Sequence, residues 1–363
     1  YLFVPAPGAG PGYLLIWISV LYLGWTLVGI PYAAWGAELS TDYHERSRVT
    51  AAREMFTVAG LILAGLIPAA VGAGTQATLG HGLHALAVVT VVLLPIGALL
   101  LAVIVPEPAR AHPSVPHGPL ALRAVWRNGP FRRLLLSSVL GGLGNAVNHT
   151  LAILFYTHVL HLPAQASLLI LVYFVAGVVA VPFWVRRSAA STKHRTLAIA
   201  GLWGCAWFLL TPLLPDGQML PVTIVTLMTG IVMAVPPVLG ASMAADVVDL
   251  DALRSQQPRA ALFFALWGMG TKTALALGVG LALPLLDWAG FHANAANGPD
   301  ALRALTLLYC VVPVMFWLGS IAVIWNFPIT PTRHARIRAR LERRNARAVG
   351  APLSGSETAV PAG

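Results

Sequence analysis

The sequence predicts an all-α polytopic membrane protein, and both its composition and its apolar blocks indicate this. Hydrophobic residues make up 57% of the 363 residues, and charged residues make up only 10%. Soluble domains carry about 25% charged residues, so a soluble chain of this length would lack the charge to cover its surfaces. The apolar residues also fall in blocks of about 20 or more, which is the length that a membrane-spanning helix needs.

Nine apolar segments are candidate membrane-spanning helices. In chain order these are Tyr13–Leu39, Val49–Val71, His84–Val105, Leu134–Leu160, Ser167–Val185, Leu197–Leu214, Pro221–Val247, Ala260–Leu286 and Leu302–Trp325. A short stub, Tyr1–Pro5, precedes them and is similar to the end of another span. Because the chain does not begin with Met, we expect that an N-terminal part of the protein is missing.

Basic residues occur in every second connection between the spans. The basic set comprises Arg46, Arg48, the cluster from Arg110 to Arg133, the cluster from Arg186 to Arg195, Arg254, Arg259 and the tail from Arg333 to Arg347. The other connections contain only one lysine or arginine, Arg303. By the positive-inside rule the basic set, with the C-terminus, is cytoplasmic. We interpret the tail as a basic helix lying against anionic lipid, so the net charge of +10 favours the bilayer over nucleic acid as a partner.

Four side chains within the spans are candidate solute-binding residues. Lys272 lies near the middle of its span, where a charge costs about 3 kcal/mol unless it faces a polar cavity. Arg53 lies about two turns inside its span, and its guanidinium is a forked donor for hydroxyls or a carboxylate. Asn148 can bond a ligand or join two helices, and Trp35 can stack on a sugar ring or face lipid. For Lys272 and Arg53, snorkelling or structural pairing stays open.

An acidic run near the end of the seventh span permits a different interpretation. Asp246, Asp249 and Asp251 resemble a metal–diphosphate motif, and with Asp42 and Glu45 they could hold Mg²⁺ in a membrane prenyl-type transferase. Each acidic group, however, has arginines in its own connection. Ion pairs at the ends of helices explain the pattern more simply, so we expect neither an enzyme nor a metal cofactor.

Two motifs carry a family resemblance. The stretch Ile30–Arg53 is similar to the region that joins the fourth and fifth helices of the glycoside–pentoside–hexuronide:cation symporters. The run Ala245–Asp251, followed by Arg259 and Lys272, is similar to the end of the tenth helix and to the eleventh helix of the same family. The chain thus resembles this melibiose permease-like family of the major facilitator superfamily over almost its whole length.

The resemblance implies a twelve-helix transporter fold in which the nine spans are helices four to twelve. It divides the chain into the remainder of an N-terminal bundle (1–106), a cytoplasmic central loop (107–133), a C-terminal six-helix bundle (134–327) and a basic cytoplasmic tail (328–363). It further implies a monomer in the bacterial plasma (inner) membrane, in which the two bundles rock around a site near the midplane.

The resemblance also implies residue roles. Arg53 corresponds to a sugar-contacting residue, and Lys272 corresponds to a cavity residue near the cation and sugar sites. The coupling cation would be H⁺ or Na⁺. The best-studied member has a cation-binding Asp where this chain has Gly29 and a sugar-stacking Trp where it has Ala33. With the family's helix-two carboxylates also outside the chain, the cation site is incomplete here.

A cytoplasmic gate follows from the same resemblance. Asp246 and Asp249 match the family's gate carboxylates, and Asp42 and Arg259 belong to the same cytoplasmic ends. In the outward-open state we expect the two carboxylates to pair with cytoplasmic arginines, with Arg186 and Arg259 as candidates.

The predicted function is cation-coupled symport of a sugar, glycoside or related polar organic solute by alternating access. One alternative is a transporter of another solute class, such as a lipid or drug, on the same fold. The Mg²⁺-dependent transferase and a non-functional fragment are further alternatives.

Overall fold

The computed structural model describes residues 10–38, 53, 56–57, 59–64, 67, 76–105, 119–163, 165–256, 259–293, 295 and 297–349. All regular structure in these residues is helical, which confirms the predicted all-α fold. The helices are α1 (Pro11–Glu38), α3 (Gln76–Ile104), α4 (Pro119–Trp126), α5 (Gly129–His158), α6 (Ala166–Ala190), α7 (Lys193–Phe208), η1 (Thr211–Leu213), α8 (Met219–Gly230), α9 (Val235–Ser255), α10 (Ala260–Trp288), α11 (Pro299–Cys310), α12 (Val312–Ile324) and α13 (Pro331–Val349).

The membrane spans agree with the sequence prediction. In the described part of the chain, eight stretches are long and apolar enough to cross a membrane, and each overlaps a predicted span. The remaining predicted span, Val49–Val71, falls largely outside the described residues. The protein is therefore a multi-pass membrane protein.

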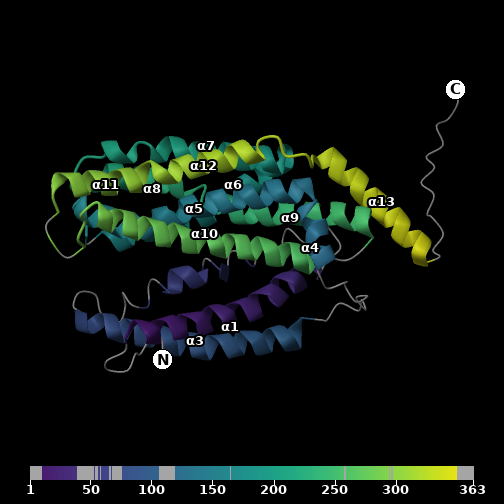
Figure 1. Cartoon of the computed structure of the whole chain (residues 1–363), viewed down its shortest axis with the longest axis horizontal. Helices are drawn as coiled ribbons and strands as arrows, with labels where there is room; N and C mark the ends of the chain where they lie inside the picture. Colours follow the sequence, from purple (N-terminus) through teal and green to yellow (C-terminus); the bar gives the residue numbers. More distant parts are fainter. Residues whose placement is uncertain are drawn as a thin grey trace.

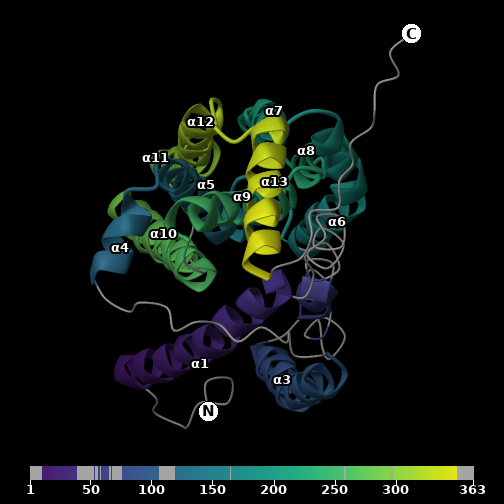
Figure 2. The ribbon, with the colours of Figure 1, turned by 90° about the vertical axis from the view of Figure 1, so that its right-hand side faces the viewer.

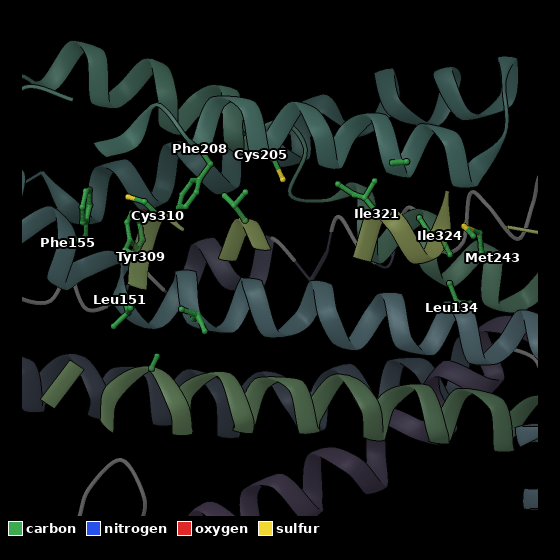
Figure 3. Close-up of a cluster of buried hydrophobic side chains, with 14 of the residues drawn as sticks. Leu134, Leu151, Phe155, Cys205, Phe208, Met243, Tyr309, Cys310, Ile321 and Ile324 are labelled. Carbon is green, nitrogen blue, oxygen red and sulfur yellow. The ribbon is translucent and has the colours of Figure 1, made fainter. Parts of the chain in front are cut away.

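Helix α5 lies at the centre of a bundle formed by α5 to α12. It packs against α10 and α12, while α6 packs against α8, and α7 packs against α8 and α12. The helices α1 and α3 run along one side of this bundle (Figure 1). The core around α5 includes Phe155, whose ring stacks on Tyr309 with 4.4 Å between the centroids, and Phe208 lies beside Tyr309 (Figure 3).

Helix α5 begins earlier than the sequence analysis suggested. It starts at Gly129, inside the segment 107–133 that was predicted as a loop, and the short helix α4 also lies there. The backbone N–H of Phe131 donates to Asn128 Oδ1 at 3.2 Å, and Pro130 occupies the first turn. An asparagine cap followed by proline is a strong helix-start signal, so the local chemistry explains the boundary.

The span predicted as Pro221–Val247 is broken into α8 and α9. The turn at residues 231–234 interrupts the helix, and proline in the first turn of α9 lacks the N–H that would continue the ladder. Two tryptophans bond to carbonyls at the break: Trp184 Nε1 donates to the Ile231 carbonyl at 2.8 Å, and Trp203 Nε1 donates to the Met228 carbonyl at 3.0 Å. These bonds matter because the hydrocarbon region offers no water to replace them.

The tail helix α13 packs on the bundle instead of lying free against lipid. Its apolar residues Ile337 and Leu341 are buried in the same core as α9. Arg344 Nη1 also donates to the Ala252 carbonyl of α9 at 3.0 Å. We call the end of the bundle where α6 and α9 stop near Arg187 and Arg254, and where α10 begins after Arg259, its arginine-rich end. Viewed along the bundle, α13 crosses this end from the side of α7 and α12 toward that of α1 (Figure 2).

Candidate functional site

A cavity of about 1460 Å³ lies between α1 and the bundle and extends into the bundle itself. Helices α5 to α13 contribute to its wall, together with α1 and α3. Small-molecule pockets usually measure about 300–1,000 Å³. The cavity therefore has room for an organic solute together with water.

Lys272 reaches across the cavity from α10 to α1. Its Nζ donates to the Thr26 hydroxyl and lies 4.7 Å from the centroid of the Trp25 ring. The Thr26 hydroxyl in turn donates to the Tyr22 carbonyl at 2.6 Å, which leaves its oxygen to accept from the ammonium. The ion pairs between described residues do not include Lys272. The ammonium is thus held in the cavity by neutral groups.

Arg53 lines the same cavity, its side chain is half-buried, and its predicted solute-binding role stays a prediction. Its backbone carbonyl accepts from the Thr57 hydroxyl at 3.0 Å. Trp35 belongs to α1, but its side chain is outside the part of the chain that the structure describes. The structure therefore brings Arg53 and Lys272 to one cavity and leaves the role of Trp35 as a prediction.

The two asparagines of α5 have separate roles. Asn145 Oδ1 accepts from Trp317 Nε1 at 2.9 Å and so joins α5 to α12. Asn148 is 7% exposed and lines the cavity. Its Nδ2 has no hydrogen-bond partner among the described residues. A buried donor without a partner is costly, so this amide is ready to bond an acceptor on a solute or a water.

A charged network lies at the arginine-rich end of the cavity. The two carboxylate oxygens of Asp246 lie 2.8 Å and 2.7 Å from Lys193 Nζ. His334 Nε2 lies 3.2 Å from Asp249 Oδ2 and 3.5 Å from Asp246 Oδ1, and Arg338 Nη1 lies 3.6 Å from Asp249 Oδ2. All of these side chains line the cavity. Helices α7, α9 and α13 are thus tied together at one point.

The network includes an arginine, as expected for the gate, but the ion pairs of the two carboxylates given above involve neither candidate arginine. The carboxylate partners described above are a lysine, a histidine and a tail arginine, where the sequence suggested Arg186 and Arg259. Arg259 lies instead beside Asp251, which also accepts from the Ser255 hydroxyl at 3.2 Å. Asp42 lies outside the described residues. Sequence reasoning missed His334 because the approach of α13 to α9 is a tertiary contact without a local signal.

A helical membrane bundle with a large cavity, lined mainly by apolar side chains with a few polar and charged ones, and with ion pairs at one end is the arrangement of a membrane transporter. Residues 1–331 match the family described as MFS/sugar transport protein. The chain therefore belongs to that family. This confirms the resemblance inferred from the two motifs, and it places the chain among transporters and not among enzymes.

Curated relatives include both sugar and lipid symporters. The chain is 31% identical over 153 residues to an uncharacterized symporter of Synechocystis sp., covering 40% of this chain and 26% of that protein. It is 23% identical over 350 residues to the sodium-dependent lysophosphatidylcholine symporter 1 of Homo sapiens, covering 87% and 64%. It is 23% identical over 350 residues to the glucuronide carrier protein homolog of Escherichia coli, covering 92% and 74%. The chain thus spans less than two thirds of the length of the first two.

Proposed function

We propose that this protein is a cation-coupled symporter of a sugar, glycoside or related polar organic solute that works by alternating access. The observation that carries the proposal is Lys272, a cation at mid-helix that crosses the cavity to Thr26 and Trp25 of α1. A charge at that depth is tolerated where it faces a polar, water-filled cavity or a ligand, and such residues mark solute pathways.

The cavity offers donors for a solute rich in oxygen. Lys272, Arg53 and the free Nδ2 of Asn148 all donate hydrogen bonds. Hydroxyl, ring and carboxylate oxygens of a glycoside accept such bonds. Trp35 completes the proposed solute-binding set through stacking on a sugar ring.

The coupling cation is H⁺ or Na⁺ in this proposal. Relatives include symporters whose names specify sodium or a cation. A carboxylate outside the described residues would pair with Lys272 and also serve the cation. Ion and solute binding would then be linked through one charge.

The charged network of Asp246 and Asp249 serves as the cytoplasmic gate, with Arg259 and Asp42 at the same side. In this assignment the arginine-rich end and the C-terminus face the cytoplasm of a bacterium, by the positive-inside rule. The protein acts as a monomer with two bundles. Residues 1–106 form its N-terminal part, and 107–133 form its central connection, in which α4 lies and α5 begins. Residues 134–327 form the C-terminal bundle, and 328–363 form the tail.

A lysophospholipid is the second candidate solute. The human lysophosphatidylcholine symporter is as similar to this chain as the glucuronide carrier homolog, at 23% identity over 350 residues each. The cavity wall also carries apolar residues of α8 and α9, such as Val225 and Leu239, that suit an acyl chain. Such a lipid would place the phosphate of its zwitterionic headgroup at Lys272.

Uptake into proteoliposomes containing the full-length protein tests the proposal. Labelled glycosides and labelled lysophosphatidylcholine are compared with and without an imposed proton or sodium gradient, for the wild type, Lys272→Ala and Met269→Ala. Met269 is an exposed residue of α10 outside the cavity wall and serves as the control. We expect gradient-driven glycoside uptake in the wild type and Met269→Ala and a weakened gradient dependence in Lys272→Ala.

Two results would contradict this assignment. An identical gradient dependence in the wild type and Lys272→Ala would remove the coupling role and leave Lys272 as a structural residue. Accumulation of lysophosphatidylcholine without any glycoside would replace the first solute class by the second.

A further inference from the structure

We propose that Asn148 and Thr211 form a second solute subsite, which holds a hydroxyl-bearing ring of an elongated glycoside while Lys272 holds its other end. This inference rests on the proposed function. Asn148 is 7% exposed, Thr211 is 4% exposed, and both line the cavity. Asn148 Nδ2 and Thr211 Oγ1 have no hydrogen-bond partner among the described residues. Buried polar groups are nearly always hydrogen-bonded, so these two indicate a ligand.

The packing of α5 against α10 shows how far the subsite lies from Lys272. The two helices approach each other closely at two glycines, with Gly142 against Ala274 and Gly278 against Ala146. Both pairs are 132 positions apart, so Gly280 is at the same height along the bundle as Asn148. Gly280 lies eight residues beyond Lys272, which corresponds to about 12 Å of helix. A single sugar ring does not span that distance, but a disaccharide does.

Thr211 comes to nearly the same height from the end of α7. Gly141 of α5 and Gly201 of α7 both face α12, at two adjacent residues of that helix. Asn148 lies seven residues beyond Gly141, and Thr211 lies ten residues beyond Gly201. Because a helix rises about 1.5 Å per residue, the two side chains differ in height by about 5 Å. Helices α5 and α7 therefore bring both groups to one part of the cavity.

Three aromatic side chains line the cavity in the same part. The Phe208 ring, three residues before Thr211, lies 5.3 Å from the Tyr309 ring between centroids (Figure 3). The Tyr309 ring lies 6.3 Å from that of Tyr156, which follows Asn148 by about two turns on the same side of α5. Aromatic walls with a few placed polar groups are typical of small-molecule sites.

The chemistry of the subsite favours a sugar ring over an acyl chain. The amide Nδ2 of Asn148 donates hydrogen bonds, and the Thr211 hydroxyl both donates and accepts them. Hydroxyl groups of a sugar ring can satisfy both. Against an acyl chain the two groups would stay unpaired, and burial of an unpaired polar group is costly. We therefore expect the subsite to select disaccharides.

The test measures sugar binding to the full-length protein in lipid nanodiscs by isothermal titration calorimetry. The probes are maltose, cellobiose, lactose and xylobiose, each compared with the methyl glycosides of its component monosaccharides, and lysophosphatidylcholine. We expect at least one disaccharide to bind the wild type about tenfold more tightly than its methyl glycosides, because two further hydrogen bonds contribute roughly a factor of three each.

Two variants remove the proposed contacts with little change in volume. Thr211→Val and Asn148→Leu should each lower the preference for the disaccharide over its methyl glycoside about threefold. Neither should lower the melting temperature without sugar, because a buried group without a partner does not stabilise the fold. Thr223→Val is the matched control. The Thr223 hydroxyl donates to the Met219 carbonyl at 2.8 Å outside the cavity wall, so this variant should bind sugars like the wild type.

The outcomes separate this inference from the proposed function. An unchanged disaccharide preference in both variants would overturn the subsite and leave its two groups to water or to a structural role. Binding of methyl glycosides by the wild type without any preference for a disaccharide would overturn the subsite but not the proposed function. If no sugar binds, both are overturned, and binding of lysophosphatidylcholine alone would support the second candidate solute.

Discussion

The bundle α5–α12 and the two helices α1 and α3 differ sharply in how much of their surface is buried. None of the residues in the spanning stretches of α1 and α3 is buried, whereas 22–44% are buried in the other spans of the described chain. Leu151 of α5 is fully buried, yet Val91 of α3 is 71% exposed. The helices with the least burial are nevertheless strongly apolar, since α3 contains no Asp, Glu, Lys or Arg.

The difference teaches that apolar composition and close packing have separate causes in a membrane. Apolar composition inserts a helix, but lipid tails are as apolar as leucine, so hydrophobicity alone does not draw helices together. Small residues do so by letting backbones approach. A Cβ added at Gly278 of α10 would overlap Ala146 Cβ and lie 3.2 Å from the Leu143 carbonyl, while one added at Gly97 of α3 would meet nothing within 4 Å among the described residues.

The largest expected effect on the melting temperature comes from adding a side chain at Gly278, where α5 and α10 are in close contact. Gly278→Val should lower the melting temperature by roughly 5–10 °C, because overpacking costs about 1–3 kcal/mol and the joint between α5 and α10 has no space. The control Gly97→Val should change it by less than about 1 °C. A thiol-reactive dye reports unfolding, since Cys205 and Cys310 are buried and free. An equal drop in the melting temperature of both variants would show that α3 packs as tightly as the bundle.

A second substitution tests the contact between α1 and the bundle. Trp25→Ala removes the ring over Lys272, a cation–π contact of about 1 kcal/mol, so the KM for solute should rise about fivefold. The melting temperature should hardly change, because both reporter cysteines lie in the bundle. Trp17→Ala is the matched control on the same helix, where the ring contacts Tyr13. An unchanged KM in Trp25→Ala would mean that α1 does not position Lys272.

The smallest effect concerns one pair of hydroxyls. Ser320 Oγ donates to the Ser137 carbonyl at 2.8 Å, and Ser137 Oγ lies 2.9 Å from Ser320 Oγ, so the pair joins α5 to α12. Ser320→Ala should lower the melting temperature by about 2 °C, since such bonds contribute about 0.6 kcal/mol within membranes. Thr90→Ala on α3 removes a hydroxyl that bonds its own helix at Leu86, and we expect no measurable change. A comparable drop in both variants would contradict the contrast between the regions.

The spans were predictable from sequence because hydrophobic length is a property of each segment alone. The start of α5 was also encoded locally, in the asparagine cap and proline at its N-terminus. The break between α8 and α9 was missed because the apolar run continues through it, and only two prolines mark the spot. Apolar composition therefore predicts where the chain crosses the membrane better than where a helix is interrupted.

The site was predictable only in part. A charged side chain in the middle of a membrane span is costly, and this singled out Lys272 as a candidate. The structure places Lys272 with Arg53 and Asn148 around one cavity. Its contacts with Thr26 and Trp25 join residues 246 positions or more apart, and no local pattern reveals such a pair. His334 was missed for the same reason, because it lies 85 positions from Asp249 in the sequence. The assignment of these residues to solute and gate remains a prediction.

The break between α8 and α9 has a mechanical consequence. Because Trp184 and Trp203 hold carbonyls at the break, the break is fixed to α6 and α7, and α9 extends from it toward its ion pairs with α7 and α13. Asp246 lies eleven residues beyond Val235, so α9 acts as a lever arm of about 17 Å from this pivot. A tilt of about 10° would shift the carboxylate by about 3 Å. That shift matches the 2.7 Å between Asp246 and Lys193, so a small rotation at an anchored hinge is enough to part the ion pair.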